Sequence, residues 1–93
     1  MTNKKPTVSI IIRTKNEEKY IKQCIEKIRI QNFKSFEIII VDNYSTDLTV
    51  KKAKKHCHKI IKIKKFSPGK AINEGIKASR GSIIVVLSAH CIP

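Results

Sequence analysis

Three short polar segments, each placed directly after an apolar run, carry the side chains in this sequence that can do chemistry. They are Arg13–Asn16, Asp42–Asp47 and Ser88–Cys91. A buried parallel strand delivers the loop that follows it to its carboxyl end, and open α/β sheets bind ligands at that edge. The three segments therefore predict a ligand site. The candidate binding residues are Arg13, Thr14, Asp42, Asn43, Ser45, Lys70 and Ser88, with His90 as a candidate metal ligand.

The elements that must position these segments are four apolar runs and three amphipathic stretches. The runs are too short for helices and predict strands at 8–12, 37–41, 60–63 and 82–87, the third of them at or near a sheet edge. Apolar residues at helical spacing predict a first helix over 17–30. A second helix should follow residue 46, and a third should present Ile72, Gly75, Ile76 and Ser79 to the core.

Polar residues and one glycine mark the expected ends of these helices. Asn16 is placed to cap the first helix, and Ser45 or Thr46 to cap the second. Asp47 is better explained as a residue at that helix start than as a ligand contact. Gly81 suits the left-handed position that follows many helices, so we expect it to end the third helix.

Alternation of strands and helices predicts an α/β fold in which right-handed crossovers make the strands parallel. We expect a single domain over residues 1–93, a Rossmann-like three-layer sandwich with strand order 3-2-1-4 and a switch point between the first and fourth strands. The three polar segments would then share one rim. Because the sequence stops directly after a strand, we expect it to be part of a larger domain.

The formal net charge of +13 is the strongest feature of the composition. It attracts phosphates, nucleic acid or anionic lipid, although a lysine-rich solvated surface explains it equally well. A basic nucleic-acid-binding module is therefore the alternative function. It lacks support from aromatic residues, which make up 5% of the chain, and from any helix-turn-helix or RNA-binding signature.

Other features of the composition indicate a reducing compartment. No apolar run approaches the roughly 20 residues that span a bilayer, and no signal peptide is recognisable. The three cysteines lack C-x-x-C spacing and are expected to be free thiols. His56, Cys57 and His58 lack the spacing of a zinc site. The expected location is the cytoplasm, which includes a place at the inner face of the membrane.

Four motifs in order connect the sequence to a known family. The chain has R-T-K-N-E at 13–17, V-D-N-Y-S-T-D at 41–47, G-K-A-I-N-E-G-I at 69–76 and L-S-A-H at 87–90. Over residues 7–93 it resembles the amino-terminal half of the family 2 glycosyltransferases, which have the GT-A fold. Their typical motifs are P-T-Y-N-E, V-D-D-G-S-T-D, G-x-x-x-A-x-N-x-G-I and L-D-A-D.

The departures from these motifs concern the nucleotide and the metal. Arg13 and Lys15 replace Pro and Tyr and add positive charge beside the expected nucleotide, where a guanidinium can pair with phosphate. Asn43 replaces an acid that contacts the base in relatives. Ser88 and His90 replace the acids of the D-x-D motif, which hold a divalent metal such as Mg²⁺ or Mn²⁺. Imidazole suits Mn²⁺, Zn²⁺ or a site without metal, so metal dependence stays open.

The resemblance also implies roles for single residues, each with a structural alternative. Asp42 would accept a hydrogen bond from the base or ribose, or would hold its own loop by bonding backbone amides. Arg13 and Lys70 would meet the diphosphate, or would be ordinary surface cations. His90 would bind the metal or the diphosphate, or would be a structural histidine.

As a whole, the resemblance implies an enzyme that transfers a sugar, with inversion, from a nucleoside diphosphate sugar to an acceptor glycan or lipid-linked glycan. Bacterial polysaccharide or glycolipid synthesis is the expected setting, with peripheral contact to an anionic membrane. The catalytic base of the family lies past the position of Pro93. We therefore expect residues 1–93 to hold the nucleotide and to catalyse little or nothing. The donor sugar, its base and the acceptor are not specified by the sequence.

Overall fold

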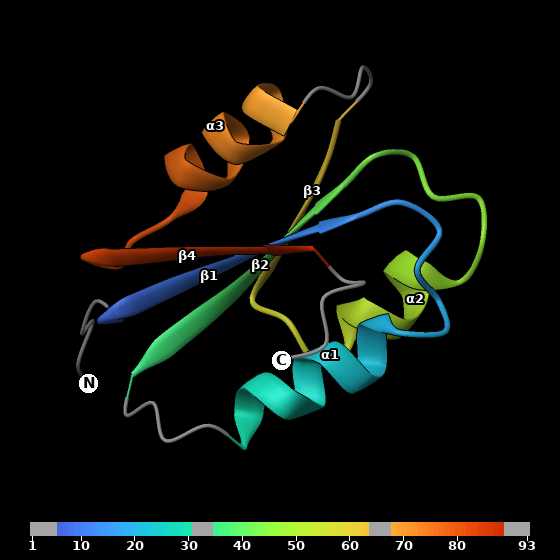
Figure 1. Ribbon diagram of the computed structural model, residues 1–93, viewed down its shortest axis with the longest axis horizontal. Coiled ribbons are helices and arrows are strands. Elements are labelled where there is room, and N and C mark those ends of the chain that lie inside the picture. Colours follow the sequence, from blue (N-terminus) through green and yellow to red (C-terminus); the bar gives the residue numbers. More distant parts are fainter. Residues whose placement is uncertain (1–5, 31–34, 64–67, 89–93) are drawn as a thin grey trace.

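The computed structural model describes residues 6–30, 35–63 and 68–88. Within them four strands alternate with three helices, as Figure 1 shows. The elements are β1 (Val8–Thr14), α1 (Ile21–Arg29), β2 (Phe36–Asp42), α2 (Thr49–Lys54), β3 (Lys59–Lys62), α3 (Pro68–Ala78) and β4 (Ile83–Ser88). The alternation of strands and helices predicted from the sequence is confirmed, while His90 lies outside the described residues.

The strands form one parallel sheet in the order β3-β2-β1-β4, which confirms the predicted topology. In its register Ile10 of β1 lies beside Ile38 of β2 and Val85 of β4. The chain reverses its direction of travel across the sheet between β1 and β4. This places the switch point at the carboxyl ends of β1 and β4, where Arg13 lies beside Ser88.

Alternating residues of the central strands fill two separate cores, one on each face of the sheet. Ile10 and Ile12 pack with Ile25 of α1 and Ala53 of α2, and Ile11 packs with Ile39 on the opposite face. Figure 1 shows α1 and α2 below the sheet and α3 above it. β-branched residues suit a strand buried on both faces, and the three-layer arrangement is the one expected.

A buried polar network joins the amino ends of the strands to the end of α3. Glu37 accepts hydrogen bonds from the Ser9 hydroxyl at 2.6 Å and from the Arg80 N–H at 2.6 Å, and Ser9 Oγ accepts one from the Gly81 N–H at 2.7 Å. Ser9 and Glu37 are both buried. The network therefore fixes the return of the chain from α3 into β4.

Gly81 is required by this close packing and not by backbone conformation. None of the described glycines has a positive φ, so the expected left-handed conformation is wrong. A Cβ atom at this position would instead lie 2.7 Å from the backbone nitrogen of Ser9 and 2.8 Å from the carbonyl carbon of Val8.

Both predicted helix starts on the site side of the sheet are wrong. Helix α1 begins at Ile21 and not at Glu17, because residues 17–20 form a turn in which the Glu17 carbonyl accepts from the N–H groups of Tyr20 and Ile21. Asn16 is therefore not the cap of α1, which is preceded by Tyr20. Helix α2 begins at Thr49, and the residue before it, Leu48, makes no side-chain cap. The polar residues expected to cap these helices bond between the loops instead.

Apolar residues of α3 and β4 are more exposed than the apolar pattern of the sequence predicted. Ile76 of α3 is 43% exposed, and Ile83 and Ile84 of β4 are 55% and 38% exposed. Gly75 instead brings α3 against the sheet, since a Cβ there would lie 2.6 Å from a methyl group of Ile11. This contact centres α3 over β1 and β2, and leaves Ile76 outside the core.

Candidate functional site

A pocket of about 160 Å³ lies at the switch point between β1 and β4. It is lined by Arg13, Thr14, Lys15, Glu17 and Ser88. Three of these residues are among the predicted binding residues, namely Arg13, Thr14 and Ser88. Ligands of open α/β sheets bind at this place in the topology, outside the carboxyl ends of the strands.

Arg13 lines the pocket and carries a buried hydrogen-bond donor for which no partner is described. Its Nε atom is buried and has no hydrogen-bond partner in the part of the chain that the structure describes. Buried polar groups of folded proteins are nearly always bonded, and each exception calls for an explanation. A guanidinium that lines a pocket is suited to an oxyanion such as a phosphate.

Thr14, Asp42 and Ser45 form a closed network between the ends of β1 and β2. Asp42 Oδ1 accepts from the Thr14 hydroxyl at 2.5 Å and from the Ser45 hydroxyl at 2.6 Å, while Oδ2 accepts from the Ser45 N–H at 2.9 Å. Asp42 is 1% exposed. The structure thus places its carboxylate where it holds the loop, and neither Asp42 nor Ser45 lines the pocket. Their contact with a ligand stays a prediction.

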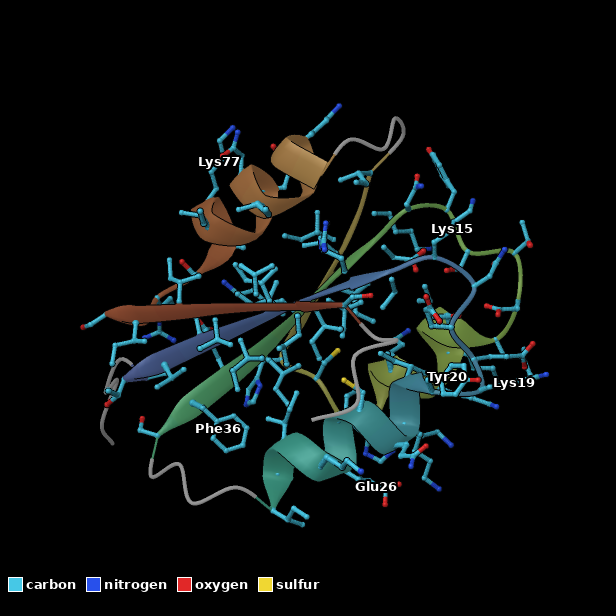
Figure 2. The ribbon with its side chains drawn as sticks, viewed as in Figure 1. Lys15, Lys19, Tyr20, Glu26, Phe36 and Lys77 are labelled. Atoms are coloured by element: carbon cyan, nitrogen blue, oxygen red, sulfur yellow. The ribbon has the colours of Figure 1, made fainter. Side chains whose placement is uncertain are left out.

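The loops after β1 and β2 are bonded directly to each other. Asn16 has a φ of 50° and donates its N–H to Ser45 Oγ at 2.8 Å, while its side-chain oxygen accepts from the Thr46 N–H at 2.7 Å. Lys15 donates to the Tyr44 carbonyl at 3.3 Å, and Figure 2 shows Lys15 where these loops run side by side. The two loops therefore behave as one unit.

Tyr44 adopts a conformation that its residue type disfavours. Its φ is 46°, and it stands where the motif V-D-D-G-S-T-D has glycine. A left-handed conformation costs a residue with a side chain about 1–2 kcal/mol. The hydrogen bonds between the two loops hold the backbone on either side of Tyr44 and can stabilise its left-handed conformation.

Asp47 joins the start of α2 to the turn before α1, in agreement with its predicted place at a helix start. It accepts from the Thr49 N–H at 2.9 Å, from the Glu18 N–H at 3.3 Å and from the Thr49 hydroxyl. Desolvation raises the pKa of Asp47, and the hydrogen bonds from Thr49 and Glu18 lower it; the net pKa lies below the ordinary 3.8.

Asp47→Asn is expected to lower the free energy of unfolding by about 1 kcal/mol at neutral pH, because an amide supplies one acceptor oxygen where the carboxylate supplies two. A carboxylate whose pKa is lowered on folding stabilises the protein above its unfolded-state pKa, and the effect is lost as pH falls through the folded-state pKa. The difference between variant and wild type should therefore shrink in acid. Urea unfolding at neutral pH and at about pH 3 measures it.

The matched control for this prediction is Glu74→Gln. Glu74 pairs with the exposed Lys77 at 3.5 Å, so its removal should change stability little at either pH. An Asp47→Asn effect of equal size at both pH values would contradict the assigned role of the charge.

The other predicted site residues do not all meet in this pocket. Asn43 is half-buried and donates its N–H to the Thr14 carbonyl at 3.0 Å. Lys70 is exposed in the first turn of α3 and does not line the pocket. His90 lies outside the described residues. Within 6–30, 35–63 and 68–88, no group of three or more His, Cys, Asp and Glu side chains is arranged to hold a metal ion.

Two residues at this rim were given no site role in the sequence analysis. Glu17 is 8% exposed and lines the pocket. Thr49 is fully buried, and its hydroxyl accepts from the Glu17 N–H at 2.7 Å. The motif T-x-N-E was a signal for Glu17. No local signal indicates Thr49, because its partner is 32 positions away.

The thiol of Cys57 lies away from this rim, between α2 and β3. Burial raises its pKa, which keeps the thiol protonated and unreactive at neutral pH. It is a free cysteine, as expected. None of the helices in the described ranges is long and apolar enough to span a membrane.

The family model described as "Glycosyl transferase family 2" matches residues 9–93. The chain is 41% identical over 95 residues to the Methanococcus voltae protein named dolichyl N-acetyl-alpha-D-glucosaminyl phosphate 3-beta-D-2,3-diacetamido-2,3-dideoxy-beta-D-glucuronosyltransferase, covering 92% of this chain and 30% of the relative. The chain thus spans less than a third of that protein. These similarities agree with the resemblance seen in the four motifs.

Solved structures share the fold. Staphylococcus aureus TarS in complex with UDP-GlcNAc has a TM-score of 0.75 and 30% identity, covering 89% of this chain and 26% of that one. A mannosyltransferase of Pyrobaculum calidifontis in complex with GDP-Man and Mn²⁺ has a TM-score of 0.80 and 23% identity, covering 94% and 28%. The described sheet therefore matches part of a GT-A glycosyltransferase, as the motifs predicted.

Proposed function

Because this chain belongs to glycosyl transferase family 2, we propose that it forms the nucleotide-sugar-binding part of an inverting glycosyltransferase. The donor would be a nucleoside diphosphate sugar. A uridine nucleotide is the first candidate, since the TarS structure at 30% identity holds UDP-GlcNAc. The chain spans less than a third of the relatives reported above, so the proposal for residues 1–93 is limited to donor binding.

The observation that carries this proposal is the pocket at the switch point with the buried, unpaired Nε of Arg13. Its place between β1 and β4 is where an open α/β sheet binds a nucleotide. The lining includes the Glu17 carboxyl group and the Thr14 hydroxyl, which donates to Asp42. Its other residues are two cations, Arg13 and Lys15, and the Ser88 hydroxyl. Such groups bind a diphosphate through charge-assisted hydrogen bonds.

In the proposed reaction, negative charge develops on the diphosphate as it leaves, and the site must stabilise that charge. The acceptor hydroxyl attacks the anomeric carbon, a carboxylate base takes its proton, and the bond from that carbon to the diphosphate oxygen breaks. Arg13 and Lys15, with Lys70 from α3, would hold the departing diphosphate by fixed positive charge. Asn43 would contact the base, because its amide both donates and accepts.

A divalent metal is implied by the family motif but does not fit the described residues. Of the D-x-D position only Ser88 is described, and a neutral serine hydroxyl is a weak substitute for a carboxylate toward Mg²⁺. No step of the proposal is therefore routed through a metal. His90, the other residue at the D-x-D position, is the remaining candidate metal ligand.

We further propose that the acceptor is a glycan carried on a lipid. The relative from Methanococcus voltae is named for a dolichyl-linked sugar phosphate, which motivates this choice. Synthesis of surface polysaccharide or glycolipid is the corresponding setting. A lipid-linked acceptor would place the protein at a membrane surface, and we propose the cytoplasmic face.

Arg13→Gln is expected to weaken binding of UDP and UDP-GlcNAc by about 10- to 100-fold, because a charged hydrogen bond to phosphate contributes about 1.5–3 kcal/mol. Isothermal titration calorimetry with each nucleotide measures the change. Arg80→Gln is the matched control, since it removes the same charge from an exposed position at the opposite edge of the sheet.

Two results would sink the proposal. One is a wild-type chain that binds neither UDP nor GDP, and the other is an equal loss in both arginine variants. The basic nucleic-acid-binding module gains no support from the comparisons, which are with glycosyltransferases. It would be favoured only by salt-sensitive binding of duplex DNA without any nucleotide binding.

A further inference from the structure

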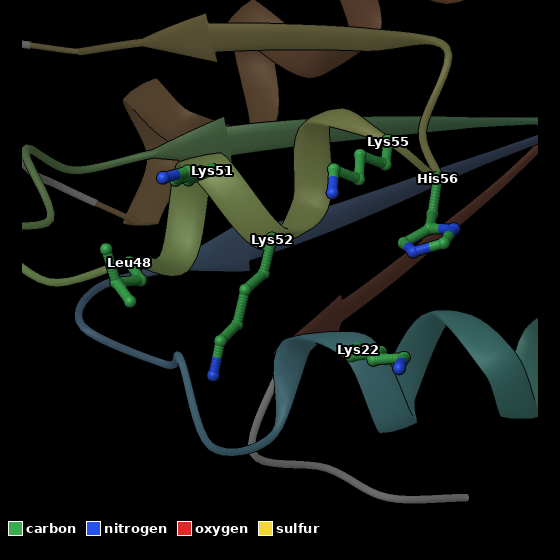
Figure 3. A pocket seen from close by; sticks show the side chains of 6 residues that line it. All are labelled: Lys22, Leu48, Lys51, Lys52, Lys55 and His56. Carbon is green, nitrogen blue, oxygen red and sulfur yellow. The ribbon is translucent and has the colours of Figure 1, made fainter.

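A second concave surface, unrelated to the switch-point pocket, lies between α1 and α2. This groove has a volume of about 330 Å³ and is lined by Lys22, Leu48, Lys51, Lys52, Lys55 and His56. Figure 3 shows Lys22 on α1 and the other five on or next to α2. It shares no residue with the pocket that contains Arg13. We call it the lysine groove.

The charge of the lysine groove is largely unneutralised. Lys22, Lys51 and Lys55 are exposed, and within the described residues no carboxylate pairs with any of them. Lys52 differs, since it lies 3.8 Å from the Glu18 carboxylate and donates to the Glu18 carbonyl at 3.1 Å. The segment 49–56 contains no acidic residue. Three unpaired ammonium groups therefore face solvent around one hollow.

The kind of cation in the groove indicates a diffuse anionic surface. Arginine forks bind a phosphate in a fixed bidentate geometry, whereas lysine is a flexible, strongly hydrated point charge that imposes no such geometry. None of the described residues that line the groove is an arginine. Lysines near an anionic bilayer are attracted to its surface potential without needing a fixed geometry.

Leu48 distinguishes a bilayer from another polyanion. It is 50% exposed and lines the groove beside the lysines. Apolar side chains next to basic ones enter the boundary between headgroups and acyl chains, while a nucleic-acid backbone offers them nothing. We propose that the lysine groove is the surface through which this protein docks on anionic lipid headgroups. This inference rests on the lipid-linked acceptor proposed above.

The test compares two charge-matched pairs of substitutions in vesicle co-sedimentation. The chain is mixed with phosphatidylcholine vesicles containing about 30 mol% phosphatidylglycerol, at about 0.1 M salt. Lys51→Gln with Lys55→Gln should weaken partition into the vesicles about tenfold or more, since each lysine near the surface contributes substantially. Leu48→Ser should weaken it further.

The control pair is Lys62→Gln with Lys77→Gln, which removes the same charge away from the groove. Lys62 is exposed on β3, and Lys77 lies on α3, across the sheet from α1 in Figure 2. Less than a twofold change is expected. Equal loss in both pairs, absence of binding to the anionic vesicles, or duplex DNA displacing the vesicles through the same lysines would overturn the inference.

Nucleotide binding separates this inference from the proposed function. The Lys51 and Lys55 pair should leave UDP affinity unchanged, because neither residue lines the switch-point pocket. Arg13→Gln should leave vesicle partition unchanged for the same reason. Vesicle binding that persists without nucleotide binding would therefore count against the enzyme proposal alone.

Discussion

Asp42→Ala should lower the free energy of unfolding by about 3 kcal/mol, because each buried polar group left without its partner costs about 1–3 kcal/mol. The two hydroxyls and one N–H that Asp42 accepts from would all lose their acceptor at once. For a domain of this size the melting temperature should fall by about 10–20 °C. Thermal unfolding followed by circular dichroism measures it.

Asp42→Asn is the matched variant for this prediction. The amide keeps the shape of the carboxylate and one oxygen that accepts hydrogen bonds, so the loss should be roughly half that of the alanine variant. A variant Asp42→Ala as stable as wild type would contradict the assigned role. The carboxylate would then be free to serve a ligand, as the sequence alone allowed.

Gly81→Ala should destabilise the protein by about 2–4 kcal/mol, because the added methyl group meets backbone atoms that cannot rotate away. The Cβ atom would lie 2.7 Å from the Ser9 nitrogen and 2.8 Å from the Val8 carbonyl carbon. Relief requires the loop to move, which breaks the hydrogen bond of its N–H to Ser9 Oγ. The midpoint of urea unfolding reports the change.

Gly69→Ala, unlike Gly81→Ala, is not expected to destabilise the protein. A Cβ atom at Gly69 has nothing within 4 Å, and the residue lies in the first turn of α3. Alanine is favoured over glycine in a helix by up to about 1 kcal/mol, so this variant should be as stable as wild type or more stable. If both alanine variants behaved alike, close packing at Gly81 would not be the reason for its identity.

The sheet could be predicted because each strand is a local signal. The runs of isoleucine and valine at 8–12 and 37–41 are short, β-branched and bounded by polar residues, so their state does not depend on distant partners. The handedness of the crossovers made the strands parallel, and the order 3-2-1-4 is the one expected of a Rossmann-like sheet. The switch point, and with it the place of the site, was fixed by the same reasoning.

The helix starts and the role of Asp42 could not be predicted because they depend on contacts between loops. Asn16 is a good helix cap by type, but its oxygen is used by the Thr46 N–H, 30 positions away. Asp42 is likewise held by Thr14, 28 positions away. Ile76 has the right spacing for the core and is exposed only because Gly75 centres α3 elsewhere.

The position of β4 at the sheet edge has a consequence for handling the protein. Within the described residues β4 pairs with β1 alone, so its other side presents unpaired backbone N–H and C=O groups next to the exposed Ile83 and Ile84. Such an edge is a template for a further strand. A strand from the same polypeptide would complete the sheet, whereas a strand from another copy would begin an intermolecular sheet and start aggregation.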